Sequence, residues 1–402
     1  MLCNKLKWHK RFCICLNLLY LCRIPRFLFY IVMNKFNIII GLCAYLLTNC
    51  GGHTAPAHID VDLNEKTSIE SLEKYLQIDS LIPVSSDEYA IFRFDKMIRR
   101  SSDIYILDKT QQAVFVINTS SRNIHKIINF RGAARNEYID ITDIAMDKNN
   151  NIYVFDSDSR KVNIYNTEGK FINSIKVNSG TSIALSHDNE IAINANELED
   201  EQVIVYSSSG EQSCRIEHPS QRPQYTLDDI GSIASWGDEF IYTTPFDFNI
   251  YQTSGTSSVP LAFLSFGDRQ FDVKELNGLD YGAYQKLLLK STDKVMQLEH
   301  LSVYNDLIFF STDRSDQLMY DNKEKTVTVL SNVESPYYIL FSAPISVSEN
   351  GEFCVALSYS NICNGYLPWV KTNGTKLPQL SSASDSANEG NNTFWLLMGY
   401  VK

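Results

Sequence analysis

Residues 146–175, with the sequence MDKNNNIYVFDSDSRKVNIYNTEGKFINSI, contain three short apolar runs separated by Asn, Asp and Gly. Runs of Ile, Val, Tyr and Phe bounded by such turn residues are typical of consecutive antiparallel strands. The pattern recurs 48 residues earlier, where IYILD (104–108) matches IYVFD (152–156), and 39 residues later in a shorter form. A period of about 40–50 residues with four short strands is typical of a β-propeller blade.

The most regular part of the repeat is a hairpin in which five mostly polar residues separate two apolar ones. It begins at Ile98, Met146, Leu185, Ala234, Leu301 and Val347. Successive hairpins begin 48, 39, 49, 67 and 46 residues apart, so the 67-residue interval contains an insertion. Tyr284 and the leucines after it recur there at helical spacing. The sequence therefore predicts an all-β, six-bladed propeller with four-stranded antiparallel blades and a short helical insertion at about residues 272–298.

The two ends of the body are expected to close the ring. Residues 59–63 (IDVDL) alternate apolar and acidic side chains and predict a first strand, and TSIE (67–70) predicts the start of a short helix with Leu76 on its apolar face. The run YLPWVK (366–371) is expected in blade six. The final apolar run, 394–401, can pair with blade six or with residues 59–63. Pairing both chain ends in one blade would remove exposed strand edges.

The charge distribution argues against a polyanionic partner. The chain carries a net charge of −11, yet residues 1–49 contain seven Lys and Arg and no Asp or Glu. The remaining 29 basic and 47 acidic residues give the rest a charge of −18. Nucleic-acid and anionic-membrane binding usually require a basic surface. We therefore expect a monomeric soluble body that binds no nucleic acid.

The segment MNKFNIIIGLCAYLLTNC (33–50) has the basic start, apolar run and cleavage region of a secretory signal. Its end, LTNC, resembles a bacterial lipobox, which implies that Cys50 carries diacylglycerol and becomes the mature N-terminus. Residues 33–49 are then a lipoprotein signal peptide, residues 50–58 a tether and residues 59–402 the propeller. An ordinary secretory signal with an incidental cysteine is the alternative. Residues 1–32 are interpreted as an extension of the gene model upstream of the true start.

The loop RGAARNEY (131–138), followed by ITDIAMD (141–147), resembles a G-x-G-P-x-E-Y segment and the strand after it. That segment occurs in the six-bladed β-propeller lipoproteins abundant in Bacteroidetes, which are similar to NHL-repeat and TolB-like propellers. Ala134 and Arg135 stand where that family usually has Gly and Pro. The ending EGNNTFWLLMGYVK (389–402) is also similar. The resemblance implies the propeller fold after the signal and no particular activity.

Candidate ligand-binding residues are expected on the propeller face opposite the six hairpins. They are Arg131, Arg135, Glu137, Tyr138, Asp156, Asp158 and Arg160. Asp108, Asp247 and Asp313 are expected on the same face. Carboxylates with arginines and tyrosines around a funnel suit a cation, a sugar or a basic peptide. Aspartates also occupy turns because their side chains bond their own backbone, and this simpler interpretation stays open.

Sequence motifs of enzymes are not found. The chain contains no H-E-x-x-H pair, G-x-S-x-G elbow, P-loop or dinucleotide fingerprint. DKNNN (147–151) begins like a calcium loop but has Ile152 at position six and Asp158 at position twelve, where Gly and Glu are required. Cys214, Cys354 and Cys363 are expected to be free thiols, with no metal and no cofactor.

These observations predict a lipid-anchored binding or scaffold module of the cell envelope. The partner is expected to be a peptide, a glycan or a protein bound at the face opposite the hairpins. No early acidic run follows Cys50, so an outer-membrane lipoprotein facing the periplasm is expected. The alternatives are a calcium-dependent hydrolase or lyase of the lactonase type on the same fold, and a purely structural envelope protein.

Overall fold

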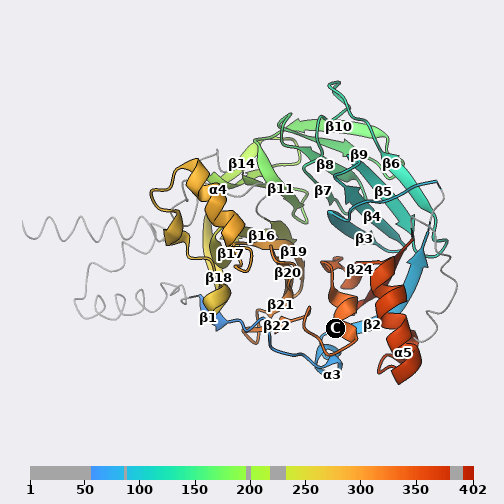
Figure 1. Cartoon of the computed structure of the whole chain (residues 1–402). Coiled ribbons are helices and arrows are strands. Elements are labelled where there is room, and N and C mark those ends of the chain that lie inside the picture. The colour runs from blue at the N-terminus through green and yellow to red at the C-terminus, as the bar shows by residue number, and fades with distance from the viewer. Residues whose placement is uncertain (1–55, 86–87, 196–200, 218–231, 381–392) are drawn as a thin grey trace, which may run out of the picture. The chain divides into compact units, whose positions relative to one another are not determined.

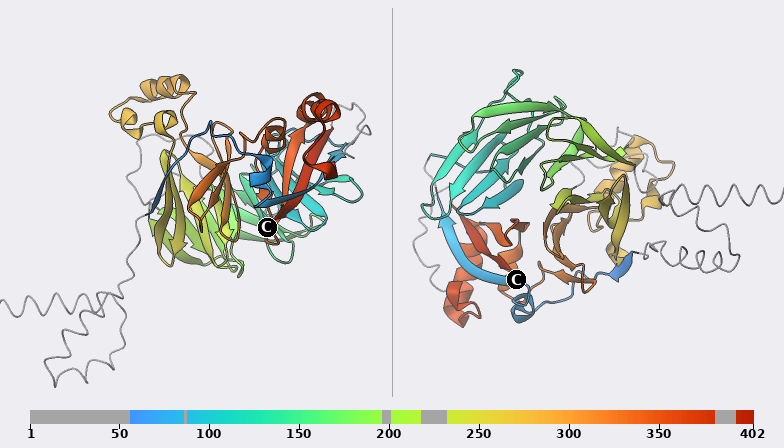
Figure 2. Two further views of the ribbon diagram at one scale, coloured as in Figure 1. Left: turned by 90° about the horizontal axis from the view of Figure 1, so that it is seen from below. Right: turned by 180° about the vertical axis from the view of Figure 1, so that it is seen from behind.

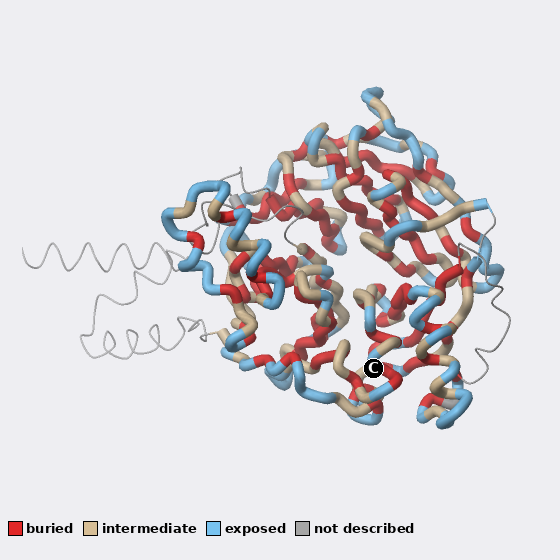
Figure 3. Tube along the Cα trace, viewed as in Figure 1, coloured by how far each residue is buried: buried red, intermediate tan, exposed pale blue. Residues whose placement is uncertain are grey.

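The computed structural model describes residues 56–85, 88–195, 201–217, 232–380 and 393–402. These residues form six sheets around a central axis (Figure 1). Each sheet has four antiparallel strands, and the fourth sheet carries one further parallel strand at its edge. Buried residues follow the strands, and exposed residues concentrate in the connections (Figure 3). The predicted six-bladed propeller with four-stranded blades is confirmed. The expected gene-model extension, signal peptide and Cys50 lie outside the described residues.

The strands of the first five blades follow one another along the chain. Blade one contains β3 (Lys96–Arg100), β4 (Asp103–Asp108), β5 (Ala113–Asn118) and β6 (Ile124–Ile128); blade two contains β7 (Asp143–Met146), β8 (Ile152–Asp156), β9 (Lys161–Tyr165) and β10 (Phe171–Lys176). Blade three contains β11 (Gly180–Leu185), β12 (Ile191–Ala195), β13 (Glu201–Tyr206) and β14 (Gln212–Glu217); blade four contains β15 (Ile233–Trp236), β16 (Glu239–Thr244), β17 (Asp247–Ser254) and β18 (Ser257–Ser265). Blade five contains β19 (Leu298–Tyr304), β20 (Leu307–Thr312), β21 (Gln317–Asp321) and β22 (Thr326–Val329).

All six predicted hairpins join the first two strands of a blade, but they use two kinds of turn. In blades two, three and six the pairing closes across five residues, as between Met146 and Ile152. Asp147 accepts hydrogen bonds from backbone N–H groups of its own turn, and Ser186 and Ser348 do the same in theirs. In blades one, four and five the pairing continues further and leaves a two-residue turn. The same five-residue spacing between apolar residues therefore occurs with two different turn geometries.

Blade six is built from both ends of the described chain. It contains β23 (Ser346–Val347), β24 (Glu352–Ser358), β25 (Phe394–Val401) and β2 (Leu76–Val84). The last strand, β25, pairs with β24 on one side and with β2 on the other. Closure of the ring by both chain ends agrees with the expectation. It leaves β25, whose residues are nearly all buried, with hydrogen-bonded neighbours along both edges.

The N-terminal strand that closes the ring is not residues 59–63. That region contributes β1 (Ala57–Asp60), which pairs in parallel with β18 of blade four. The short helix α3 (Ile69–Leu72) forms as predicted, with the Ser68 hydroxyl accepting a hydrogen bond from a first-turn backbone N–H. It ends after one turn, so the prediction that Leu76 belongs to it was wrong. Leu76 instead begins β2, because it pairs with Val401 at the free edge of β25.

Besides α3, helical segments among the described residues occupy three connections of the propeller. The insertion between β18 and β19 contains η3 (Gly267–Arg269), η4 (Val273–Leu276) and α4 (Tyr281–Lys290); later connections contain η5 (Tyr337–Phe341), η6 (Ser360–Tyr366), α5 (Leu367–Asn373) and η7 (Pro378–Leu380). Tyr284 of α4 packs with Phe246 and Met296, so the insertion rests on the propeller as expected. Tyr366 ends η6 and residues 367–371 lie in α5, so this run forms no strand, because β25 takes the third place in blade six. None of the described helices is long and apolar enough to cross a membrane.

Candidate functional site

The two faces of the propeller differ in what they carry. The hairpins between first and second strands lie on one face, here called the hairpin face. The opposite face, here called the loop face, carries the connections between blades and the turns between second and third strands. Helices α4 and α5 stand on this same side (Figure 2). The predicted site residues belong to the loop face, in the connection after β6 and the turn after β8.

Two of these predicted residues are fully buried and hold the loop together. The Tyr138 hydroxyl accepts a hydrogen bond from the Phe130 N–H at 3.0 Å and donates one to the Gln112 carbonyl at 2.6 Å. The Asp156 carboxylate accepts a hydrogen bond from the Ile139 N–H at 2.7 Å. Burial also raises the pKa of Tyr138 well above its ordinary value. Both side chains therefore stabilise the connection between blades one and two.

The other five predicted residues lie nearer the surface. Arg131 donates a hydrogen bond to a backbone carbonyl, and Glu137 accepts one from a backbone N–H of the same loop. Arg135, Asp158 and Arg160 are exposed. All seven predicted residues come from the neighbourhood of blades one and two, and none of them lines the central channel. A ligand site formed by these residues stays a prediction.

The other aspartates considered from the sequence also bond to backbone groups or to neighbouring side chains. Asp108 accepts hydrogen bonds from the backbone N–H groups of Phe92 and Gln111, and Asp313 from that of Met296. Asp247 accepts hydrogen bonds from residues of its own strand. These contacts agree with the simpler interpretation, in which Asp is selected for its turn geometry. Within the described ranges, no three His, Cys, Asp or Glu side chains come together to hold a metal ion.

Replacing Tyr138 with Phe is expected to lower the free energy of unfolding by about 1–3 kcal/mol, because the buried Gln112 carbonyl and the Phe130 N–H lose their hydrogen-bond partner. Equilibrium denaturation by urea measures this change. Tyr338→Phe is the matched control, because Tyr338 is 46% exposed. Equal losses in the two variants would contradict the structural role of the Tyr138 hydroxyl.

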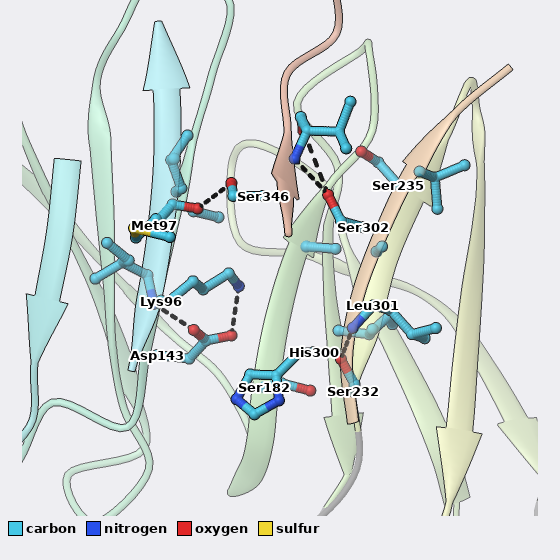
Figure 4. A pocket seen from close by; sticks show the side chains of 18 of the residues that line it. Lys96, Met97, Asp143, Ser182, Ser232, Ser235, His300, Leu301, Ser302 and Ser346 are labelled. Carbon is cyan, nitrogen blue, oxygen red and sulfur yellow. Dashed lines mark hydrogen bonds and ion pairs between the residues drawn. The ribbon is translucent and has the colours of Figure 1, made fainter. Parts of the chain in front are cut away.

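A channel of about 590 Å³ lies on the propeller axis and is lined by the first strands of all six blades (Figure 4). Hydrogen bonds link the blades at or near its wall. From the first junction to the last, they join Lys96 Nζ to Asp143 Oδ2 (2.7 Å), Ile183 N to Asp143 Oδ2 (2.9 Å), Asn194 Nδ2 to Thr243 O (3.2 Å), Leu301 N to Ser232 Oγ (2.8 Å), Val347 N to Ser302 Oγ (2.8 Å) and Ser346 Oγ to Met97 O (2.6 Å). Each junction between neighbouring blades thus has a polar link. Several polar side chains of the channel wall therefore hold the ring together.

His300 is a channel residue that none of these links uses. It occupies a β-bulge in β19 with φ +54°, a left-handed conformation that is uncommon for residues other than glycine. Its Nδ1 atom lies 2.8 Å from Ser311 Oγ, while 39% of its side-chain surface stays accessible. Burial and, to a smaller extent, the Lys109 charge lower the pKa of His300 to about 4, although Asp143 opposes the shift. At neutral pH the channel therefore contains an uncharged imidazole.

No pattern in the sequence points to the residues of this channel. His300, Lys109 and Ser235 line it together, but they come from three different blades. Two kinds of hairpin and one long insertion shift the spacing between blades, so these residues share no common position in the repeat.

A second cavity of about 610 Å³ lies between blade four and the insertion. Phe246, Phe248 and Phe271 line it, and these side chains are nearly fully buried. Phe246 and Phe271 belong to the small core that attaches α4 to the propeller. This cavity follows from the way the insertion packs, and the central channel is the stronger candidate site.

The family described as Domain of unknown function (DUF4934) matches residues 85–396. The chain belongs to this family. The DUF4934 match begins just after β2 and ends within β25, so it covers blades one to five and the strands β23 and β24 of blade six. No curated protein matches the sequence.

Several solved structures are similar to this DUF4934 protein. A protein described as "Putative exported protein" from Bacteroides fragilis NCTC 9343 is 18% identical, with a TM-score of 0.62 over 86% of this chain and 99% of the other. A DUF4221 family member from Bacteroides vulgatus is 9% identical, with a TM-score of 0.49 over 81% and 98%. An auxiliary nutrient binding protein from Bacteroides ovatus is 12% identical, with a TM-score of 0.41 over 69% and 63%. The first of these likenesses shows the propeller fold.

Proposed function

We propose that this DUF4934 protein is an extracytoplasmic binding protein that takes a small polar ligand, such as part of a glycan or a peptide, into its central channel. The channel itself carries the proposal, because it is large enough for such a ligand and is lined by groups from all six blades. His300 and Lys109 line this channel, and in the described part of the chain their side chains form no hydrogen bond or ion pair with another blade.

The cellular location in this proposal comes from the N-terminal sequence. The segment 33–50 supports export and lipid attachment at Cys50, as in the Bacteroidetes propeller lipoproteins that the chain resembles. The fold shared with a protein described as exported is consistent with this location. We place the body, as a monomer, on the periplasmic side of the outer membrane, where glycan fragments and peptides are available as partners.

Filling the channel is expected to abolish ligand binding without unfolding the protein. Ser235 lines the channel and its hydroxyl has no hydrogen bond to any residue that the structure describes, so Ser235→Phe should occupy the space and leave the links between blades intact. A thermal-shift screen of the mature chain, residues 50–402, against glycan fragments, peptides and calcium measures binding. A ligand at 100 times its dissociation constant should raise the melting temperature by roughly 5 °C in the unmodified protein.

Ser120→Phe is the matched control, because Ser120 lies in an exposed turn between β5 and β6. This variant should respond like the unmodified protein, and Ser235→Phe should not respond. A ligand that stabilises Ser235→Phe equally would contradict the channel as the site. A rise specific to calcium and abolished by a chelator would instead support the calcium-dependent hydrolase or lyase.

A further inference from the structure

Basic side chains at the loop-face end of the channel are paired with carboxylates, with one exception in the described part of the chain. Lys96 pairs with Asp143 at 2.7 Å, and Arg93 pairs with Asp95 at 2.8 Å. The Lys109 backbone N–H donates to the Asp95 carboxylate at 2.7 Å, which fixes the start of its side chain at the channel wall. The Lys109 ammonium itself has no hydrogen bond or ion pair among the described residues. A cation held in this way is available to an anion.

The two nitrogens of His300 face different surroundings. On the Nδ1 side lie Ser311 Oγ at 2.8 Å and Glu299 Oε2 at 3.7 Å. The Nε2 atom has no hydrogen-bond partner among the residues that the structure describes. Figure 4 shows the ring at the channel together with the pair of Lys96 and Asp143. The Nδ1 edge of the imidazole is thus held by the protein, and Nε2 is available to a ligand.

We propose that the channel binds a ligand through a carboxylate group, held between Lys109 Nζ and His300 Nε2. This inference rests on the proposed binding function and specifies the chemical class of the ligand, such as an acidic sugar or a peptide with a free C-terminus. Asp95 and Asp143 do not oppose an anion there, because each is paired with a cation. Glu299 lies on the Nδ1 side of the ring.

The number of available charges favours a carboxylate over a phosphate. One unpaired ammonium and one imidazole match a single negative charge, whereas a phosphate dianion usually recruits several cations or a cluster of backbone N–H groups. Lys96 and Arg93 are already neutralised by their partners. The site therefore suits a ligand with one charge at the loop-face end and neutral polar groups deeper in the channel.

Binding of the carboxylate is expected to be linked to a proton. Without ligand, burial and the positive charges of Lys109, Lys96 and Arg93 keep the pKa of His300 near 4, although Asp143 and Glu299 lie close by. A bound anion partly cancels the positive charges, so it raises the pKa of His300. The protonated form then binds more tightly. The affinity for the carboxylate should increase as the pH falls through the pKa that His300 has in the complex. It should level off below the pKa that His300 has in the free protein.

Two matched pairs of probes test the inference by isothermal titration calorimetry of the mature chain. They are D-glucuronate against D-glucose, and acetyl-alanyl-alanine against its C-terminal amide. At pH 6 at least one carboxylate should bind about tenfold more tightly than its neutral partner, as one charge-assisted hydrogen bond allows. The affinity of that carboxylate should decrease between pH 5.5 and pH 7.5.

Three variants test which residues cause the preference for the carboxylate and its pH dependence. Lys109→Met should remove the preference for the carboxylate, and Lys148→Met, at an exposed position on the hairpin face, should not. His300→Asn should remove the pH dependence, and Asn is a suitable replacement because it tolerates a positive φ better than most residues.

The inference would be overturned if Lys109→Met kept the preference for the carboxylate or if His300→Asn kept the pH dependence. It would also be overturned if carboxylates bound the unmodified protein no better than their neutral partners. Neutral probes that bind the unmodified protein but not Ser235→Phe would still support the proposed function. Carboxylates that bind equally well to the unmodified protein, to Lys109→Met and to Ser235→Phe would overturn both.

Discussion

Replacing Arg99 with Ala is expected to destabilise the protein by about 3–5 kcal/mol, because it leaves a buried carboxylate without its partner. Arg99, in β3 of blade one, reaches into blade six. Its Nη2 atom lies 3.1 Å from Glu352 Oε1, and Nη1 donates to the Phe353 carbonyl at 2.9 Å. The two charged side chains are only 7% and 15% exposed. Equilibrium denaturation by guanidinium chloride measures the loss.

Arg100 provides a control in the same strand. It pairs with Glu349 at 3.0 Å, but Glu349 is 49% exposed, and such surface pairs contribute about 0–1 kcal/mol. Arg100→Ala should therefore cost much less than Arg99→Ala. A double variant, Arg99→Met with Glu352→Leu, should recover much of the loss, because no unpaired charge remains. If Arg99→Ala costs no more than Arg100→Ala, the pair with Glu352 does not hold blade one to blade six.

Replacing Gly399 with Ala is expected to cost about 3 kcal/mol, because it separates the two strands that close the ring. A Cβ atom at position 399 would lie 2.0 Å from the Gln77 carbonyl oxygen of β2 and 2.6 Å from the Phe353 ring. The nearest atom belongs to the backbone, so relief requires β2 to move away from β25. Both the thermal midpoint and the denaturation midpoint should fall.

Gly282→Ala is the matched control for this second prediction. Gly282 lies in the first turn of α4, where an added Cβ would meet only Asp280 Oδ1, at 3.4 Å. Since alanine is the better helix former, this variant should be neutral or more stable by up to about 1 kcal/mol. If Gly399→Ala were equally neutral, β2 would not be required at the edge of β25.

Much of the blade architecture follows from local sequence. Alternating Ile, Val, Tyr and Phe runs bounded by Asn, Asp and Gly specify strands and turns within about ten residues, so six hairpins are visible from their spacing. The helix at residues 281–290 is visible for the same reason, because its apolar residues recur every three to four positions. The misplacement of residues 366–371 shows the limit of such patterns. The run is apolar enough for a strand, but β25 already occupies the place beside β24.

The predicted loop-face residues show why a site is harder to derive than a fold. Tyr138 and Asp156 are placed where their residue types allow binding, yet each is buried against backbone groups of its own connection. A sequence states which groups a residue carries, but not which of them already have partners. His300 and Lys109 stand out only because the structure shows which atoms the blades leave unused.

The sequence by itself determined the propeller, the number of blades, the insertion and the expectation that the chain ends meet, because strand and turn preferences are local and repeat along the chain. The tertiary structure decided that residues 76–84 close the ring beside β25, while residues 57–60 join blade four. It also decided which side chains line the channel. Edge pairing and convergence on an axis depend on contacts between residues far apart in sequence, and no local pattern records those contacts.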